Sequence, residues 1–325
     1  MTTDNNTQYF YSHGKLLLTG EYLVMQGAKA MALPLSLGQS LSITEQKTNQ
    51  INWETYEIDK LVFTARFHMK NFEILETTDK EKATYIQGLL RAVNTLNPAF
   101  LSNSKGLMAV AKVQFNMNWG FGSSSTLISN ISQWAPVDAF ELNRMVSKGS
   151  GFDIACARAN EPIIYQLVDQ KPLSEPIAFN PPYLSQLFLV YLNKKMPTEQ
   201  HISSLNPNQA IANQLIPIVN NITIKIRTCI QLNEFQKLIT EHEKLIGTYL
   251  HKTPVKDELF SDFQGAIKSL GAWGGDFILT ASSQSFEKQK QYFEQKGYAT
   301  LLRLDDLIFR RPKTEDRSQK TEVRS

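Results

Sequence analysis

Hydrophobic and polar positions alternate in several short stretches of the first half of the chain. Leu41–Thr44 and Ile51–Tyr56 show the two-residue period of half-buried strands, and Val110–Met117 shows it more weakly. Between these strands, apolar residues at three- and four-residue spacing predict a helix that ends at Asn97–Pro98: Ile86, Leu89, Leu90, Val93 and Leu96. Ser123–Trp134 has the same helical spacing and predicts a second helix.

The second half of the chain begins after a proline-containing stretch around 170–185. Leu187–Leu192 is continuously apolar, as a buried strand is. The segments that follow predict helices from Asn206, from Asn233 and over Val255–Leu270, then a strand, a helix and a strand at 277–281, 286–296 and 299–304. This order predicts an α+β fold with two domains, 1–175 and 185–309, and a polar tail at 310–325 that we expect to be disordered.

Composition and charge exclude several classes of protein. The chain has 325 residues, of which 42% are apolar, so it can bury a large core. The net charge of +3 is assigned to the tail, because Arg310–Ser325 holds six basic and three acidic residues and the rest of the chain is balanced. A nucleic-acid-binding protein normally carries a basic face on its folded body, so we expect no nucleic-acid partner.

The remaining composition points to a cytoplasmic protein. The apolar runs are too short to span a bilayer, and the polar N-terminus lacks the pattern of a signal peptide, so we expect no membrane partner. Only Cys156 and Cys229 are present, without a CxxC motif, which fits a reducing compartment. The five histidines show no metal-ligand spacing, and we predict that Glu241–Glu243 is a solvated helix face.

Glycine is scarce in this chain but clustered. The strongest cluster is Gly120, Gly122, Ser123, Ser124 and Ser125, which follows a predicted strand and opens a predicted helix. Exposed N–H groups and the helix dipole at such a start form an anion site, and the serine hydroxyls suit phosphate oxygens or Mg²⁺. The sequence is neither a Walker A loop nor a dinucleotide-binding fingerprint. It predicts a nucleotide-phosphate cradle of another kind, the alternative being an ordinary turn.

Two further clusters bring charged residues beside glycines. Asp153 follows a tight turn in Gly149–Ala155, and we expect it to meet a cation, a backbone N–H group or Lys15, unless it only caps a helix. Lys15 follows Gly14 and precedes an apolar run. Gly271–Asp276 joins a predicted helix to a predicted strand and contains more glycine than such a turn requires.

In this order, the clusters resemble the three signatures of the GHMP kinases, the family of galactokinase, homoserine, mevalonate and phosphomevalonate kinases. Gly14–Val24 looks like the first motif, Gly120–Ser125 like the GLGSS phosphate loop and Gly271–Asp276 like the third motif. Glu21-Tyr22 and the GSGFDIA sequence at Gly149–Ala155 are similar to phosphomevalonate kinases and to a bacterial subgroup with a GYDIA motif. The sequence departs from the family at His13, Trp119, Thr126 and Trp273.

The resemblance implies an N-terminal domain like the second domain of ribosomal protein S5 and a C-terminal ferredoxin-like domain. It implies ATP and Mg²⁺ as cofactors, with the triphosphate on Gly120–Ser125 and Ser124 on the metal. Lys15 and Asp153 would be catalytic, and the acceptor would contact the following residues: Glu21, Lys195, Gly274, Gly275 and Asp276. The implied protein is a phosphomevalonate kinase-like enzyme of isoprenoid biosynthesis, a monomer or homodimer with a small-molecule acceptor. A mevalonate kinase and a non-catalytic sensor on the same fold are the alternatives.

Overall fold

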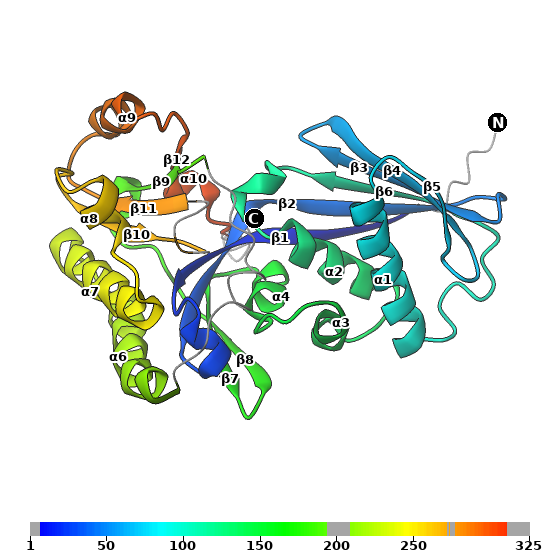
Figure 1. The fold of residues 1–325 in the computed structure, drawn as a ribbon, viewed down its shortest axis with the longest axis horizontal. Coiled ribbons are helices and arrows are strands. Elements are labelled where there is room, and N and C mark those ends of the chain that lie inside the picture. The colour runs from blue at the N-terminus through cyan, green and yellow to red at the C-terminus, as the bar shows by residue number, and fades with distance from the viewer. Residues whose placement is uncertain (1–6, 194–208, 272, 274–276, 311–325) are drawn as a thin grey trace, which may run out of the picture.

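The computed structural model describes residues 7–193, 209–271, 273 and 277–310. Two sheets lie side by side along the long axis of the molecule, each with helices packed on it (Figure 1). The larger sheet is built from strands between residues 7 and 176, and the smaller one from strands between 187 and 303. Lys195, Gly274, Gly275, Asp276 and the predicted helix start at Asn206 lie outside the described residues, as does the tail from 311.

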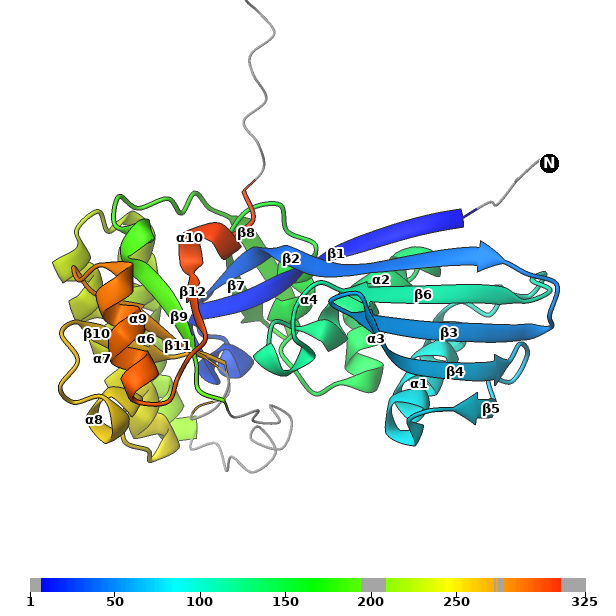
Figure 2. The same ribbon diagram turned by 90° about the horizontal axis from the view of Figure 1, so that it is seen from above.

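The larger sheet has eight strands in the order β5-β4-β3-β6-β2-β7-β8, with β1 paired to β2. The strands are β1 (Thr7–Thr19), β2 (Ala30–Glu45), β3 (Gln50–Glu57), β4 (Lys60–His68), β5 (Ile74–Thr77), β6 (Leu107–Val113), β7 (Ile163–Val168) and β8 (Lys171–Pro176). Only the β3–β6 pair is parallel among the strand pairs described. The long strands β1 and β2 run from one end of the sheet to the second part of the molecule (Figure 2).

One face of the larger sheet is covered by helices (Figure 1). They are α1 (Lys80–Leu96), α2 (Ser123–Trp134), α3 (Ala139–Val146) and α4 (Phe152–Ala157), with short 3₁₀ turns η1 (Leu23–Gln26) and η2 (Met117–Trp119). The predicted apolar stripe of α1 is buried against strands β3 and β4, and Ile128 and Ile131 of α2 join the same core. The two helices predicted from spacing in this half are therefore confirmed.

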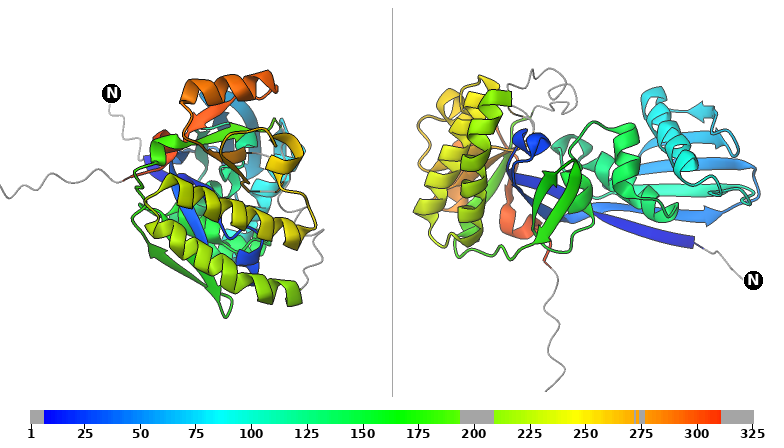
Figure 3. Two further views of the ribbon diagram at one scale, coloured as in Figure 1. Left: turned by 90° about the vertical axis from the view of Figure 1, so that its left-hand side faces the viewer. Right: turned by 90° about the horizontal axis from the view of Figure 1, so that it is seen from below.

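The smaller sheet is antiparallel in the order β10-β11-β9-β12. Its elements are η3 (Leu184–Gln186), β9 (Leu187–Tyr191), α6 (Gln209–Thr228), α7 (Leu232–Leu250), α8 (Val255–Leu259), β10 (Ala266–Ser269), β11 (Phe277–Ala281), α9 (Phe286–Gln295), β12 (Leu301–Arg303) and α10 (Leu304–Leu307). Helices α6 and α7 lie next to each other at the end of the molecule (Figure 3). None of the described helices is long and apolar enough to cross a membrane.

Two predictions for the second half are wrong. The helix predicted over Val255–Leu270 is a short helix, α8, followed by strand β10, because Gly265 at φ +148 turns the chain between them. All four residues of β10 are buried, so the strand lacks the alternation by which a strand is found. Glu241–Glu243 is not a solvated face, since His242 and Glu243 are buried.

One hydrophobic core joins the two sheets. It contains Leu16 and Phe121 from the first part, Ile226 and Phe277 from the second, and many residues between them. The segment after α10 also returns to the first part, where the N–H of Phe309 donates to the carbonyl of Pro34 at 2.8 Å. The two parts are therefore packed against each other by apolar burial.

Candidate active site

The glycine-serine loop forms the start of helix α2. Gly120 and Gly122 adopt left-handed conformations, at φ 67 and φ 89, and Gly122 is the N-cap. A Cβ at Gly122 would lie 2.6 Å from Ser125 Oγ and 2.9 Å from Lys15 Cγ, so only glycine fits there. The first N–H groups of α2 have no acceptor within the helix, which makes this end an anion cradle.

The three serines of this loop have different surroundings. Ser125 is buried, and its hydroxyl donates to the carbonyl of Gly122 at 2.9 Å. Ser124 is exposed, and its hydroxyl is hydrogen-bonded to Tyr85 Oη on helix α1. Ser123 is half-buried and begins the helix. Ser124 therefore has the hydroxyl that a metal ion bound to phosphate could reach. Tyr85, which hydrogen-bonds this hydroxyl, belongs to none of the sequence motifs.

Lys15 lies between the phosphate loop and helix α4. Its backbone N–H donates to the carbonyl of Phe121 at 2.9 Å, next to an irregularity in the β1–β2 pairing between His13 and Lys15. Its ammonium lies 5.4 Å from the centre of the Phe152 ring. The side chain therefore crosses the loop at Gly122 and ends beside the residue that precedes Asp153.

Asp153 lies in the first turn of α4, behind Gly151 at φ 84. Gly151 is the N-cap, so the alternative that Asp153 caps this helix is wrong; its Oδ1 instead accepts from the N–H of Ile154 at 3.1 Å. Burial raises the pKa of Asp153 above its ordinary value, and the nearby Lys15 charge and the Ile154 hydrogen bond offset part of that rise. Asp153 is a carboxyl group with raised basicity beside a cation.

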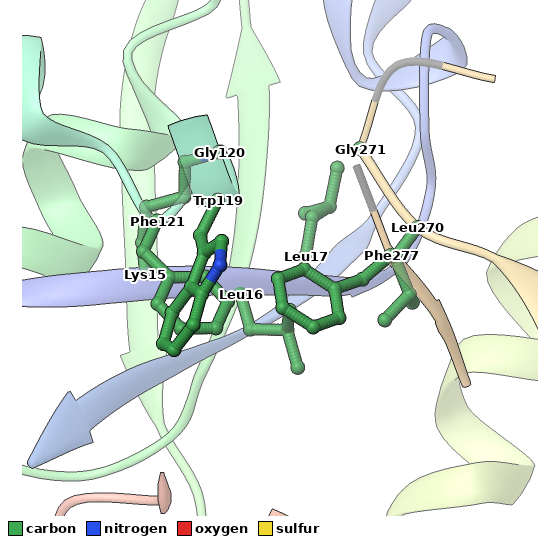
Figure 4. A pocket seen from close by; sticks show the side chains of 9 residues that line it. All are labelled: Lys15, Leu16, Leu17, Trp119, Gly120, Phe121, Leu270, Gly271 and Phe277. Atoms are coloured by element: carbon green, nitrogen blue, oxygen red, sulfur yellow. The ribbon is translucent and has the colours of Figure 1, made fainter. Parts of the chain in front are cut away.

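A narrow crevice separates the phosphate loop from the smaller sheet (Figure 4). The indole of Trp119 and the ring of Phe277 lie next to each other in it, with their centres 5.7 Å apart, and Phe277 stacks on Phe121 at 5.2 Å. Lys15 lies on the loop side, and Leu270 and Gly271 form the opposite wall. The aromatic residues of this crevice link the phosphate loop to the start of β11.

The second half of the first motif does not open into this crevice. Glu21 is 3% exposed and forms an ion pair with Lys268 of β10. Tyr22 Oη accepts from the backbone N–H of Trp273 at 2.8 Å, and Trp273 is 5% exposed in a cluster with Leu250. Trp273 therefore packs away from the crevice and does not narrow it.

The described residues contain no cluster of three or more histidine, cysteine or carboxylate groups that could cage a metal ion. Mg²⁺ is usually held in phosphoryl-transfer sites by one or two protein oxygens and by the phosphates of the nucleotide. The loop fits that arrangement, since it offers an anion cradle that a Cβ would fill and one exposed hydroxyl beside it, Ser124.

Comparison with known proteins agrees with this arrangement at the level of the fold. No protein-family model matches the chain, and no curated protein matches it in sequence. Phosphomevalonate kinase of Streptococcus pneumoniae, solved with phosphomevalonate and AMPPNP, is 16% identical, with a TM-score of 0.66 over 91% of this chain and 99% of that one. Mevalonate kinase of Methanococcus jannaschii is also 16% identical, at 0.62 over 91% and 96%.

A third similar structure has another substrate in its name. It is a D-glycero-D-manno-heptose 1-phosphate kinase from Bacteroides thetaiotaomicron, 12% identical, with a TM-score of 0.66 over 93% of this chain and 96% of that one. The chain thus has the α+β fold of the GHMP kinases, as its three glycine-rich motifs predict. The neighbours' names span different acceptors, so the fold leaves the acceptor open.

Proposed function

We propose that this protein is an ATP-dependent kinase of the GHMP type, which transfers the γ-phosphoryl group of Mg-ATP to a small-molecule acceptor. The observation that carries the proposal is the convergence of three groups from distant parts of the sequence. The N-terminus of α2, the ammonium of Lys15 and the carboxyl of Asp153 lie around one loop. Anion cradle, cation and base are the groups that phosphoryl transfer requires.

Each group has a role that follows from its surroundings. The N–H groups at Gly120–Ser125 would bind the triphosphate, and Ser124 would hold Mg²⁺, which supplies charge neutralisation when it is bound. Lys15 would stabilise the charge that develops on the transferred group. Asp153, with its raised pKa, would accept the proton of a hydroxyl acceptor. With a phosphate acceptor no strong base is needed, and Asp153 would orient Lys15.

For the acceptor we propose phosphomevalonate, with mevalonate as the alternative. Glu21-Tyr22 and the GSGFDIA sequence support this choice, as does the structural similarity to a phosphomevalonate kinase. Lys195, Gly274, Gly275 and Asp276 remain predicted acceptor contacts, and a phosphate acceptor would need a cation such as Lys195. Cytoplasmic localisation, a role in isoprenoid biosynthesis and a monomeric or homodimeric state also remain predictions.

The test is a coupled assay of ADP release with Mg-ATP and a panel of acceptors. The panel contains phosphomevalonate, mevalonate, homoserine, galactose and a sugar 1-phosphate. We expect turnover with phosphomevalonate above all others and none without an acceptor. Turnover with mevalonate alone would move the assignment to the alternative, and no turnover with any acceptor would reject the kinase.

A ligand sensor built on the kinase fold is the second candidate. The observation that favours it is the crevice itself, since it is narrow and lined by the aromatic rings of Trp119 and Phe277. A sensor would bind nucleotide or acceptor in calorimetry and release no ADP. Lys15 and Asp153 are both in place, which favours the enzyme.

A further inference from the structure

Four successive residues of the first motif each bind a different element of the second part of the molecule. Thr19 Oγ1 accepts from Thr223 Oγ1 of α6 at 2.9 Å, and the N–H of Gly20 donates to His242 Nε2 of α7 at 2.9 Å. Glu21 pairs with Lys268 of β10, and Tyr22 Oη accepts from the N–H of Trp273 at 2.8 Å. We call Thr19–Tyr22 the joint segment.

The centre of this segment is a buried group of charges. Glu21, Lys268, His242 and Glu243 are each at most 3% exposed. His242 accepts a hydrogen bond at Nε2, and burial and the Lys268 charge hold its pKa well below the ordinary value, so it is neutral. Glu243 accepts from the N–H and the hydroxyl of Ser269, at 3.0 and 2.8 Å. One ammonium thus faces two carboxyl groups, and Glu21 Oε2 has no hydrogen-bond partner.

Stability alone does not explain such a cluster. Removing two charges from water costs several kcal/mol per ion, and well-packed apolar residues of similar size are often as stabilising as a buried ion pair. A buried pair does, however, demand one relative position of its two partners, because any displacement leaves a charge unpaired. Glu21 and Lys268 therefore fix the register of two segments more strictly than apolar contacts would.

The two segments that this pair joins both lead to the crevice. Lys15 lies on β1 four residues before Thr19, and Leu270 and Gly271 come two and three residues after Lys268. Lys15, Leu16 and Leu17 line the crevice from β1, and Leu270 and Gly271 line it from the segment after β10. The Glu21–Lys268 ion pair therefore joins the two chain segments that form these walls. A shift of β10 relative to β1 would change the distance between Leu270–Gly271 and Lys15.

We propose that Glu21 and Lys268 are positioning residues for phosphoryl transfer, which set the distance between Lys15 and the Leu270–Gly271 wall. The proposal rests on the proposed kinase function and gives Glu21 a role other than the acceptor contact that the sequence predicts. It also gives Lys268, which belongs to none of the glycine-rich motifs, a role in the site. The groups that face Glu21 are Lys268 from β10 and His242 and Glu243 from α7.

The experiment compares a paired apolar replacement with its single variants. Lys268→Met and Glu21→Met each leave one buried charge unpaired, and both are expected to lower the melting temperature. The double variant Glu21→Met/Lys268→Met removes both charges of the pair and leaves Glu243 with its two hydrogen bonds from Ser269, so its melting temperature should lie above that of either single variant. Its kcat/KM for the acceptor should still fall about tenfold or more, since a displacement of about 1 Å can cost a factor of ~100 in rate. Its KM for ATP should stay within about twofold, because the α2 cradle lies on the other wall.

A second ion pair provides the matched control. Arg227 of α6 and Glu175 of β8 also join the two parts, at 3.2 Å, but on the surface and away from the crevice. Arg227→Met should leave both KM values unchanged. A double Glu21/Lys268 variant with wild-type acceptor KM and kcat would overturn the proposal, as would an equal effect of Arg227→Met.

Hydrogen–deuterium exchange separates this inference from the proposed function. In the double variant, amides of 266–271 should exchange faster than in wild type, while amides of α2 should not change. If the wild-type protein turns over no acceptor, the kinase assignment fails, and unchanged exchange at 266–271 would independently exclude a positioning effect of the pair.

Discussion

The two halves of the first motif differ sharply although they lie in one strand and its following turn. At Gly14–Lys15 the chain borders a crevice, and the Lys15 ammonium lies 5.4 Å from the centre of the Phe152 ring. Its charge lowers the pKa of Asp153, but it forms no ion pair within 4.0 Å among the described residues. At Thr19–Tyr22 every residue is buried and bound to a residue of the second part of the molecule. We call Gly14–Lys15 the open half, because it borders the crevice, and Thr19–Tyr22 the closed half, because it is buried between the two parts of the molecule.

This difference assigns two roles to one short motif, ligand binding to the open half and structural support to the closed half. A group that must act on a ligand cannot have its hydrogen bonds and charges fully satisfied within the protein, because the ligand then gains nothing by binding. A group that holds two parts in register needs a partner in the other part, because a buried charge without a counter-charge is costly. The predictions below test whether activity follows the open half and stability the closed half.

The largest effect is expected at Lys15. Lys15→Met should reduce kcat about 1000-fold, since removing one stabiliser of transition-state charge in phosphoryl transfer costs factors of ~10³ or more. The melting temperature should change little, because the ammonium makes no direct ion pair. ADP release and thermal melts measure the two effects. Lys112→Met is the control, since Lys112 also lies over an aromatic ring, Tyr56, but far along the sheet. A strongly destabilised Lys15→Met protein would contradict the division between the halves.

Asp153→Asn should lower kcat by about 100-fold or more with a hydroxyl acceptor, because a positioned base contributes factors of ~10² to 10⁴. With a phosphate acceptor the loss should be smaller, since that acceptor needs no strong base. The raised pKa of Asp153 means that its base form is lost on acidification at a higher pH than for an ordinary aspartate. A pH–rate profile of the wild type should therefore show an acidic limb that Asp153→Asn lacks. An identical limb in both proteins would remove Asp153 as the base.

The open half of the site could be predicted from the sequence for a local reason. Gly120, Gly122 and Gly151 adopt positive φ in tight turns before helices. Only glycine adopts this conformation without strain, so the residue type itself indicates the turn. The phosphate loop and the start of α2 follow from such local patterns, and Lys15 and Asp153 each stand beside a glycine turn. Tyr85 could not be predicted, because its contact with Ser124 arises from the packing of α1 on α2.

The closed half could not be predicted because it is assembled from distant segments. Glu21, His242 and Lys268 meet only through the packing of α7 and β10 on the end of β1. His242 lies between two glutamates, a pattern typical of a solvated helix face, and β10 has no alternation since both of its faces are buried. Because β10 lacks alternation, its residues are included in the helix predicted over Val255–Leu270. Tertiary packing outweighed the local pattern in each case.

Glu21 gives the closed half a pH dependence with a definite sign. Burial raises its pKa from 4.5 to about 7, although Lys268 opposes that rise. Folding therefore retains a proton that the unfolded chain releases, so this contribution to stability is full below about pH 4.5, falls as the pH rises to about 7 and is then constant. At ~1.4 kcal/mol per pH unit, the loss is at most about 3 to 4 kcal/mol.

Glu21→Gln has no such proton, so its free energy of unfolding should lack this decline. The difference between wild type and variant isolates Glu21 from Glu243 and Asp153, whose raised pKa values act in the same direction, and from His242, whose lowered pKa acts in the opposite one. Urea unfolding at several values from pH 4.5 to 8 measures it. Parallel curves for the two proteins would show that Glu21 does not titrate in this range.

The smallest effect is expected from a methyl group in the phosphate loop, which contacts Lys15 of the open half. Gly122→Ala should lower the free energy of unfolding by about 1 to 2 kcal/mol, because alanine at φ 89 is strained. Its Cβ would also press on Lys15 Cγ at 2.9 Å and on Ser125 Oγ at 2.6 Å, so the KM for ATP should rise about tenfold while the KM for the acceptor stays unchanged. Gly88→Ala is the matched control, since a Cβ at Gly88 of α1 meets nothing within 4 Å and should slightly stabilise the helix. If Gly122→Ala instead raised only the KM for the acceptor, the loop would belong to the acceptor site and not to the ATP site.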